Sequence, residues 1–276
     1  MRLDRPVGIY LVLWPALWAL WLAAGGLPPW EVLWVFVLGA VLMRSAGCVI
    51  NDYADRHFDG RVARTCQRPL ATGAIAPKQA LKLFVGLCLL SFGLVLLLNP
   101  LTVAMSFVAV ALAALYPFTK RFTYWPQAFL GAAFAWAVPM AFTAVQNQLP
   151  WQVWPLFAAT MVWALIYDTA YALVDKADDL KVGIKSTAIG FGRYVNAIIG
   201  FFQLLMLGLL VWVGQLFGLQ EVYYLSLLVV ALGFGYHQWL LSKRVPQLAF
   251  QVFLQNHWLG LVIWLGIVLD QALQAL

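Results

Sequence analysis

Charged residues are scarce in this sequence of 276 residues. Asp, Glu, Lys and Arg make up only 10% of it, 64% is hydrophobic, and the mean hydropathy is +0.85. So few charged side chains cannot cover a water-soluble surface, which excludes a soluble globular protein. Cysteine and histidine occur three times each, without a CxxC pair or a His cluster, so neither a zinc site nor a disulfide framework is indicated.

Long apolar runs fill the sequence instead. A helix needs roughly 20 apolar residues to cross the hydrocarbon layer of a membrane, and runs of that length recur from end to end. We therefore expect an all-α, polytopic membrane protein that forms a single domain over residues 1–276, with the lipid bilayer as its solvent. Nine spans are predicted, at 7–24, 31–50, 78–98, 101–118, 126–145, 152–173, 190–215, 222–241 and 252–274.

Positive charge is confined to particular connections. The net charge is +6, which in a soluble protein would suggest a nucleic-acid partner. Here the 17 basic residues lie at the N-terminus, in the connections after the second, fourth, sixth and eighth spans, or at the adjoining span ends. With nine spans these places share one face, which the positive-inside rule makes cytoplasmic. We expect no nucleic-acid partner, a cytoplasmic N-terminus and a C-terminus on the other side.

Negative charge is concentrated even more strongly, with seven of the 11 acidic residues in segments 51–59 and 167–179. If each segment continues its helix, the acids of each stack along one face: at i, i+3 and i+7 in the first, and at i, i+7 and i+11 in the second. These residues are Asp52, Asp55 and Asp59, then Asp168, Asp175 and Asp179, with Asp178 beside them. The segments follow spans four apart, which predicts two four-helix halves facing each other and a ninth helix added.

Clustered carboxylates raise one another's pKa unless a cation lies between them. Oxygen ligands on two facing helices suit Mg²⁺, which binds through a few carboxylates plus substrate phosphate oxygens, so the implied substrate is a diphosphate. Cations around the acids could stabilise a departing diphosphate: Arg56, Arg61, Arg64, Arg68, Lys176, Lys181 and Lys185. The alternative is that these charges only pair with each other and fix topology, but acids contribute little to topology.

Further candidates lie beside the segments. Arg44 is about two turns inside the second span, where a charge is costly, so a functional or paired role is favoured over an idle one. Asn51 could bind a substrate oxygen or cap its helix. Lys120 or Arg121 could hold an aromatic carboxylate, or could be ordinary positive-inside residues. Tyr171, between the acids of the second segment, is a further substrate-binding candidate.

The motifs N-D-x-x-D-R-x-x-D at 51–59 and Y-D-x-x-Y-A-x-x-D-x-x-D-D at 167–179 resemble those of the UbiA-type membrane prenyltransferases. The resemblance covers essentially the whole chain. Three further stretches, 44–52, 116–118 and 183–187, are similar to the bacterial members that act on 4-hydroxybenzoate in ubiquinone biosynthesis. The family's fold is a helical bundle with a central cavity open towards the membrane.

The resemblance implies transfer of a polyprenyl chain from its diphosphate to the carbon ortho to the hydroxyl of 4-hydroxybenzoate, in the bacterial inner membrane. By analogy Asp55, Asp59, Asp175 and Asp179 hold Mg²⁺ and diphosphate, supported by Asp52 and Asp168. Asp55, Asp175 and Arg121 are the catalytic candidates, and Asn51 and Arg121 are carried over for the acceptor. Alternatives are a prenyltransferase with a naphthoate, homogentisate or porphyrin acceptor, and an ion-coupled transporter.

Overall fold

The structure is a computed structural model that describes residues 3–56, 59–61 and 65–276, apart from the side chains of Arg61 and Val182. In the described part the chain is all helical, as predicted, and contains no strand. The long helices are α1 (Val7–Ala24), α2 (Trp30–Asp55), α3 (Pro77–Val95), α4 (Pro100–Thr119), α5 (Pro126–Ala135), α6 (Ala137–Gln146), α7 (Val153–Val182), α9 (Val195–Leu216), α10 (Glu221–Ser242) and α11 (Pro246–Gln274). Short pieces are η1 (Asp59–Arg61), α8 (Thr187–Gly190) and η2 (Gly192–Tyr194).

Within the described residues, nine helical segments are long and apolar enough to cross a membrane. They match the nine predicted spans, but the fifth is interrupted at Trp136 and divides into α5 and α6. Pro139 accounts for the interruption, because it has no N–H to donate to the carbonyl four residues earlier. The Trp136 indole N–H donates to the Met105 carbonyl oxygen at 2.9 Å, which ties the interruption to α4.

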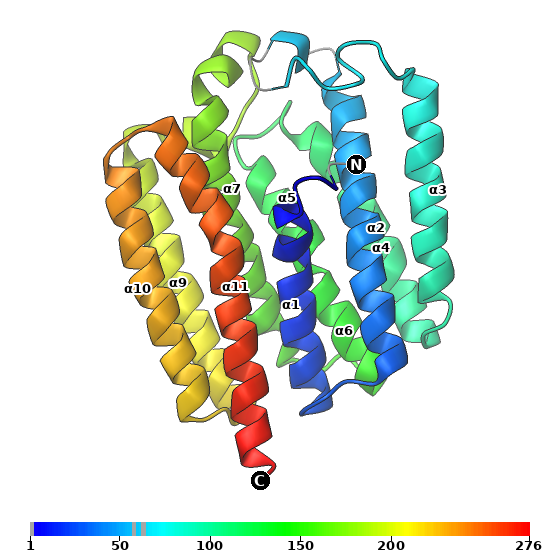
Figure 1. The fold of residues 1–276 in the computed structure, drawn as a ribbon, viewed down its shortest axis with the longest axis vertical. Coiled ribbons are helices and arrows are strands. Elements are labelled where there is room, and N and C mark those ends of the chain that lie inside the picture. The colour runs from blue at the N-terminus through cyan, green and yellow to red at the C-terminus, as the bar shows by residue number, and fades with distance from the viewer. Residues whose placement is uncertain (1–2, 57–58, 62–64) are drawn as a thin grey trace.

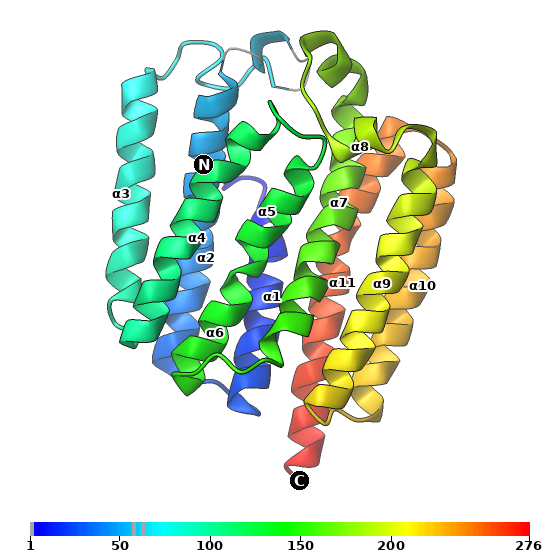
Figure 2. The same ribbon diagram turned by 180° about the vertical axis from the view of Figure 1, so that it is seen from behind.

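The helices form a bundle in which both acidic segments lie at the same end (Figure 1). α3 packs along α2, and α9 packs along α7. Viewed from behind, α9 and α10 stand together at the side opposite α3 (Figure 2). The ninth span, α11, is not simply added to two four-helix halves. It packs against α10, α1 and α7, so it joins the first helix of the chain to the helix that carries the second acidic segment.

Fully buried aromatic side chains pack against one another where α1, α7 and α11 meet. Trp18 and Trp163 are fully buried with ring centroids 5.1 Å apart, and each indole N–H donates to α11: to the Gly260 carbonyl at 2.9 Å and to Asn256 Oδ1 at 3.1 Å. A Cβ atom at position 260 would lie 2.6 Å from both Trp14 and Trp163, so only glycine permits this approach. This seam fixes α7, and therefore the second acidic segment, relative to the rest of the bundle.

Candidate active site

A cavity of about 340 Å³ opens among helices α1 to α7, with Phe253 of α11 contributing to its wall. This volume lies within the usual range for small-molecule sites. One end is polar and is formed by the two acidic segments and the connections beside them. The predicted site residues that line the cavity as a whole are Arg44, Asn51, Asp55, Asp59, Arg68, Lys120, Asp168, Tyr171, Asp175, Asp179 and Lys185.

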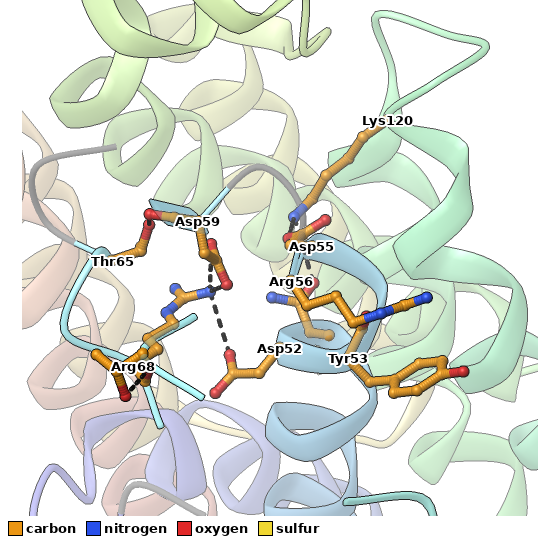
Figure 3. Close-up of polar contacts among 10 residues, drawn as sticks. Asp52, Tyr53, Asp55, Arg56, Asp59, Thr65, Arg68 and Lys120 are labelled. Atoms are coloured by element: carbon orange, nitrogen blue, oxygen red, sulfur yellow. Dashed lines mark hydrogen bonds and ion pairs between the residues drawn. The ribbon is translucent and has the colours of Figure 1, made fainter. Parts of the chain in front are cut away.

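The first acidic segment is not one continuous helix. α2 ends at Asp55, and Asp59 belongs to η1, so the expected stack of three acids on one helical face is wrong here. Arg68 Nη1 donates to both Asp59 carboxylate oxygens, at 2.9 and 2.8 Å, and lies 3.1 Å from Asp52 Oδ1 (Figure 3). The Thr65 hydroxyl donates to the Asp59 main-chain oxygen at 2.9 Å. These contacts from the following loop position Asp59.

Burial and the neighbouring Arg68 shift the pKa of Asp59 in opposite directions. Burial raises the pKa of the Asp59 carboxyl, and the Arg68 guanidinium, by its charge and its hydrogen bonds, offsets only part of that rise. The net pKa is higher than that of an ordinary aspartate. A carboxylate held in this way favours additional positive charge, such as a metal ion.

Lys120, directly after α4, forms the second ion pair of this segment. Its Nζ donates to Asp55 Oδ2 at 2.8 Å (Figure 3) and also to Asn51 Oδ1 at 3.2 Å. Burial alone would lower the pKa of the Lys120 amine, but the Asp55 carboxylate outweighs burial and the net pKa is raised. Lys120 is therefore a permanent cation facing the acids.

The second acidic segment does continue its helix, as predicted. α7 extends from Val153 to Val182, and Asp168, Asp175 and Asp179 all line the cavity. The helix ends at Gly183, whose φ of 74° is left-handed and whose N–H donates to the Asp179 carbonyl. The chain then returns to the cavity, where the Lys185 main-chain N–H donates to the Lys120 carbonyl at 3.2 Å. The end of α7 is thus fastened to the end of α4.

Other predicted site residues lie away from the cavity wall. Arg56 stacks 4.3 Å from the Tyr53 ring centroid, and Arg121 donates to the Ala54 carbonyl oxygen at 3.2 Å. Lys181 pairs with Asp178 at 2.9 Å on the exposed side of α7. Asp52 and Lys176 are half-buried near the acids without lining the cavity. The Arg61 side chain and Arg64 lie outside the described residues.

The cavity also includes residues that sequence reasoning did not select as site residues. Tyr116 and Tyr167 line it near the polar end, and the Lys120 amine lies 5.8 Å from the Tyr116 ring centroid. Cys48 also lines the cavity, and its Sγ accepts a hydrogen bond from Nη1 of the predicted site residue Arg44 at 2.9 Å. A signal was present in both cases: Tyr116 precedes Lys120, and Cys48 follows Arg44, by four residues on the same helical face.

The polar end suits a divalent ion together with a phosphorylated ligand. Among the described residues, no group of three His, Cys, Asp or Glu side chains is arranged to hold a metal ion by itself. Mg²⁺ normally uses one or two carboxylates and takes its other ligands from water and substrate phosphate oxygens. The donor set of Asp55, Asp59, Asp175 and Asp179 therefore fits Mg²⁺ in company with a diphosphate rather than a closed protein cage.

The opposite part of the cavity is apolar. It extends between α2, α3, α4 and α6 and is lined by small and hydrophobic side chains, among them Val35, Phe36, Gly39, Ala40, Val95, Leu98, Ala109, Ala113, Ala137 and Met140. A ligand that fills both parts has a strongly anionic head and a hydrocarbon tail. Such a molecule would also dissolve in the bilayer around the bundle.

The fold is shared with solved structures of low sequence identity. A UbiA homologue from Aeropyrum pernix is similar over 100% of both chains, with a TM-score of 0.82 and 22% identity. A UbiA homologue from Archaeoglobus fulgidus, solved bound to GPP and Mg²⁺, covers 97% of this chain and 98% of its own, with a TM-score of 0.74 and 17% identity.

Relatives in sequence are much closer. The 4-hydroxybenzoate octaprenyltransferase of Hydrogenovibrio crunogenus is 68% identical over 98% of this chain and 94% of its own, and that of Alkalilimnicola ehrlichii is 57% identical over 98% and 92%. The model of the UbiA prenyltransferase family matches residues 12–260. These matches confirm the predicted resemblance and do not favour a transporter. The chain belongs to the UbiA prenyltransferase family.

Proposed function

We propose that this protein transfers a polyprenyl group from its diphosphate to the ring carbon ortho to the hydroxyl of 4-hydroxybenzoate, with Mg²⁺ as cofactor. The observation that carries the proposal is that acids of both segments and the cations Arg68 and Lys120 line the polar end of one shared cavity, from which an apolar arm leads away. The names of the relatives at 57% and 68% identity supply the acceptor and the octaprenyl chain.

The reaction begins with cleavage of the allylic carbon–oxygen bond, whose electron pair leaves with the diphosphate. Bound Mg²⁺ would neutralise the charge that develops on the leaving oxygens. We assign its binding to Asp55, Asp59, Asp175 and Asp179, with Asp52 and Asp168 in support. Arg68 and Lys120 add fixed positive charge at the same end of the cavity, where preorganised charge stabilises the transition state.

The allylic cation is then attacked by the electron-rich ring carbon, and that carbon loses its proton to restore aromaticity. The Tyr116 ring and the ring pair Tyr171 and Phe253, with centroids 4.6 Å apart, could shield the cation with their faces. Asn51 remains a candidate for the acceptor, and Arg44 is added as a second one because it also lines the cavity. Arg121 is a weaker candidate than its position in the sequence suggests, because it donates to the Ala54 carbonyl rather than lining the cavity.

We further propose that the acidic end of the bundle faces the cytoplasm of a bacterial inner membrane. The positive-inside rule supports this orientation, because the connections at that end carry the Lys and Arg residues. The N-terminus would then be cytoplasmic and the C-terminus periplasmic. Cys66, in the connection after η1, is half-buried, so its reaction with a membrane-impermeant thiol reagent is compared between intact and permeabilised spheroplasts. Labelling only after permeabilisation supports the orientation, and labelling of intact spheroplasts contradicts it.

The activity is tested with purified protein in detergent, Mg²⁺ and geranyl diphosphate, offered 4-hydroxybenzoate, a dihydroxynaphthoate and homogentisate together. We expect one product, whose mass equals 4-hydroxybenzoate plus one prenyl group minus one hydrogen atom. A product formed only on another acceptor would overturn the proposed acceptor. The absence of any product over a range of prenyl chain lengths would overturn the prenyl-transfer proposal itself.

A further inference from the structure

The carboxylates assigned to the metal are already bound by cations of the chain itself. Lys120 Nζ lies 2.8 Å from Asp55 Oδ2, and Arg68 Nη1 lies 2.8 and 2.9 Å from the two oxygens of Asp59. All four residues line the same cavity. A metal ion at these oxygens therefore competes directly with two tethered cations.

Burial makes this competition significant. The side chains of Asp55 and Asp59 are 13% and 7% exposed, and those of Lys120 and Arg68 are 22% and 14% exposed. Charges this far from water are poorly screened, so a cation that loses its carboxylate needs another anion nearby. A divalent ion alone would take the Asp55 carboxylate from Lys120 and would leave Arg68 only its second carboxylate, Asp52, at 3.1 Å, whereas a diphosphate brings several anionic oxygens.

We propose that Lys120 and Arg68 exchange partners when substrate binds: they release Asp55 and Asp59 to the divalent ion and bind the diphosphate oxygens instead. This inference rests on the proposed function. Asn51 gives Lys120 a neutral contact that can persist during the exchange, because its Oδ1 accepts from the same amine at 3.2 Å. Before substrate arrives, each of the two cations is thus in contact with the carboxylate that it would release.

The exchange makes metal and diphosphate bind cooperatively. Metal alone must displace the cations at a cost, and diphosphate removes that cost by accepting them. Each ligand then raises the affinity for the other by the same factor, as linkage requires. The tethered cations would also discourage the site from holding a metal ion without substrate.

The test measures binding of Mn²⁺ alone to purified full-length protein, with Mn²⁺ replacing Mg²⁺ and free Mn²⁺ quantified by electron paramagnetic resonance. Lys120→Met frees Asp55 and should tighten Mn²⁺ binding by at least about fivefold, the lower end of typical coupling between sites. Lys120→Arg keeps a cation at this position and should bind Mn²⁺ as weakly as the wild type.

The control is Lys185→Met, which removes the same charge from the same cavity wall. The Lys185 amine donates to the Phe122 carbonyl oxygen at 3.3 Å, so this change frees no carboxylate of the first segment. We expect less than about a twofold change, below the usual range of coupling. Equal tightening by the two Met variants, or none in Lys120→Met, would overturn the exchange.

A second variant guards against failure of Lys120→Met to fold, as judged by size-exclusion chromatography. Arg68→Met releases Asp59, and with it Asp52, and should also tighten Mn²⁺ binding; a folded Arg68→Met protein with wild-type affinity contradicts the exchange. Prenyl transfer is measured separately. Product formation with unchanged Mn²⁺ affinities would reject only the exchange, whereas the expected affinities without any product would reject only the proposed function.

Discussion

The two acidic segments carry similar motifs but are built differently. The first leaves its helix at Asp55, and contacts from Arg68 and Thr65 position Asp59 beyond the helix end. The second stays within the 30 residues of α7, so the helix itself sets the spacing of Asp168, Asp175 and Asp179. Similar acidic motifs thus rest on tertiary ion pairs in one half of the bundle and on backbone continuity in the other.

The largest expected effect is shared by both segments. Asp55→Ala and Asp175→Ala should each lower prenyl transfer by at least about 100-fold, because each removes a carboxylate assigned to the Mg²⁺ that would stabilise the leaving diphosphate. Transfer is measured with purified protein at saturating Mg²⁺. Asp178→Ala is the matched control, since Asp178 lies in the second segment but outside the cavity wall. Near-normal activity of either active-site variant would contradict a two-segment site.

A smaller effect is expected where α7 ends. Gly183→Ala places a side chain at a φ of 74°, which costs about 1–2 kcal/mol for an L-residue. Thermal unfolding in detergent should show this loss. Gly86→Ala in α3 is the control, because its added Cβ meets no atom within 4 Å and its φ is not left-handed. Equal stability of the two variants would show that the helix end does not depend on Gly183.

The hydrogen bond that positions Asp59 in the first segment should contribute slightly less to stability. Thr65→Val removes the hydroxyl that donates to the Asp59 main-chain oxygen at 2.9 Å, and a hydrogen bond of this kind contributes about 0.5–1.5 kcal/mol. We expect a modest loss of thermal stability and a higher KM for the prenyl diphosphate, because Asp59 is less firmly placed. Thr65→Ser keeps the hydroxyl and should restore both values. If Thr65→Ser behaves like Thr65→Val, the hydrogen bond is not the cause.

The smallest effect is expected on the outer side of the second segment. Lys181→Ala breaks an ion pair with Asp178 in which the lysine side chain is 73% exposed. Exposed pairs contribute about 0–1 kcal/mol, so stability and activity should both stay close to wild type. A loss of activity comparable to that of Asp175→Ala would mean that this face of α7 belongs to the site.

Much of this architecture could be predicted from local patterns. The apolar runs predicted the membrane spans, and the spacing of the acids on α7 predicted that they lie on one face of that helix. Pro139 could have signalled the interruption between α5 and α6, because its missing N–H can be inferred from the sequence.

Tertiary contacts could not be predicted in the same way. Lys120 and Arg121 are neighbours of the same charge, yet only Lys120 lines the cavity. Its partner Asp55 is 65 residues away in the chain. The contacts to Asp59 come from Thr65 and Arg68, whose positions cannot be inferred from helical periodicity. Local pattern thus predicts which residues gather at one end of the bundle, while packing decides which of them face the cavity.

On the proposed function, both acidic segments together hold one diphosphate through a divalent metal ion. This joint binding is tested most directly by equilibrium binding of radiolabelled geranyl diphosphate to the wild type, Asp55→Asn and Asp175→Asn, each with Mg²⁺ and with EDTA. We expect Mg²⁺-dependent binding by the wild type and its loss in both variants. Retention of Mg²⁺-dependent binding with wild-type affinity by either variant would contradict it.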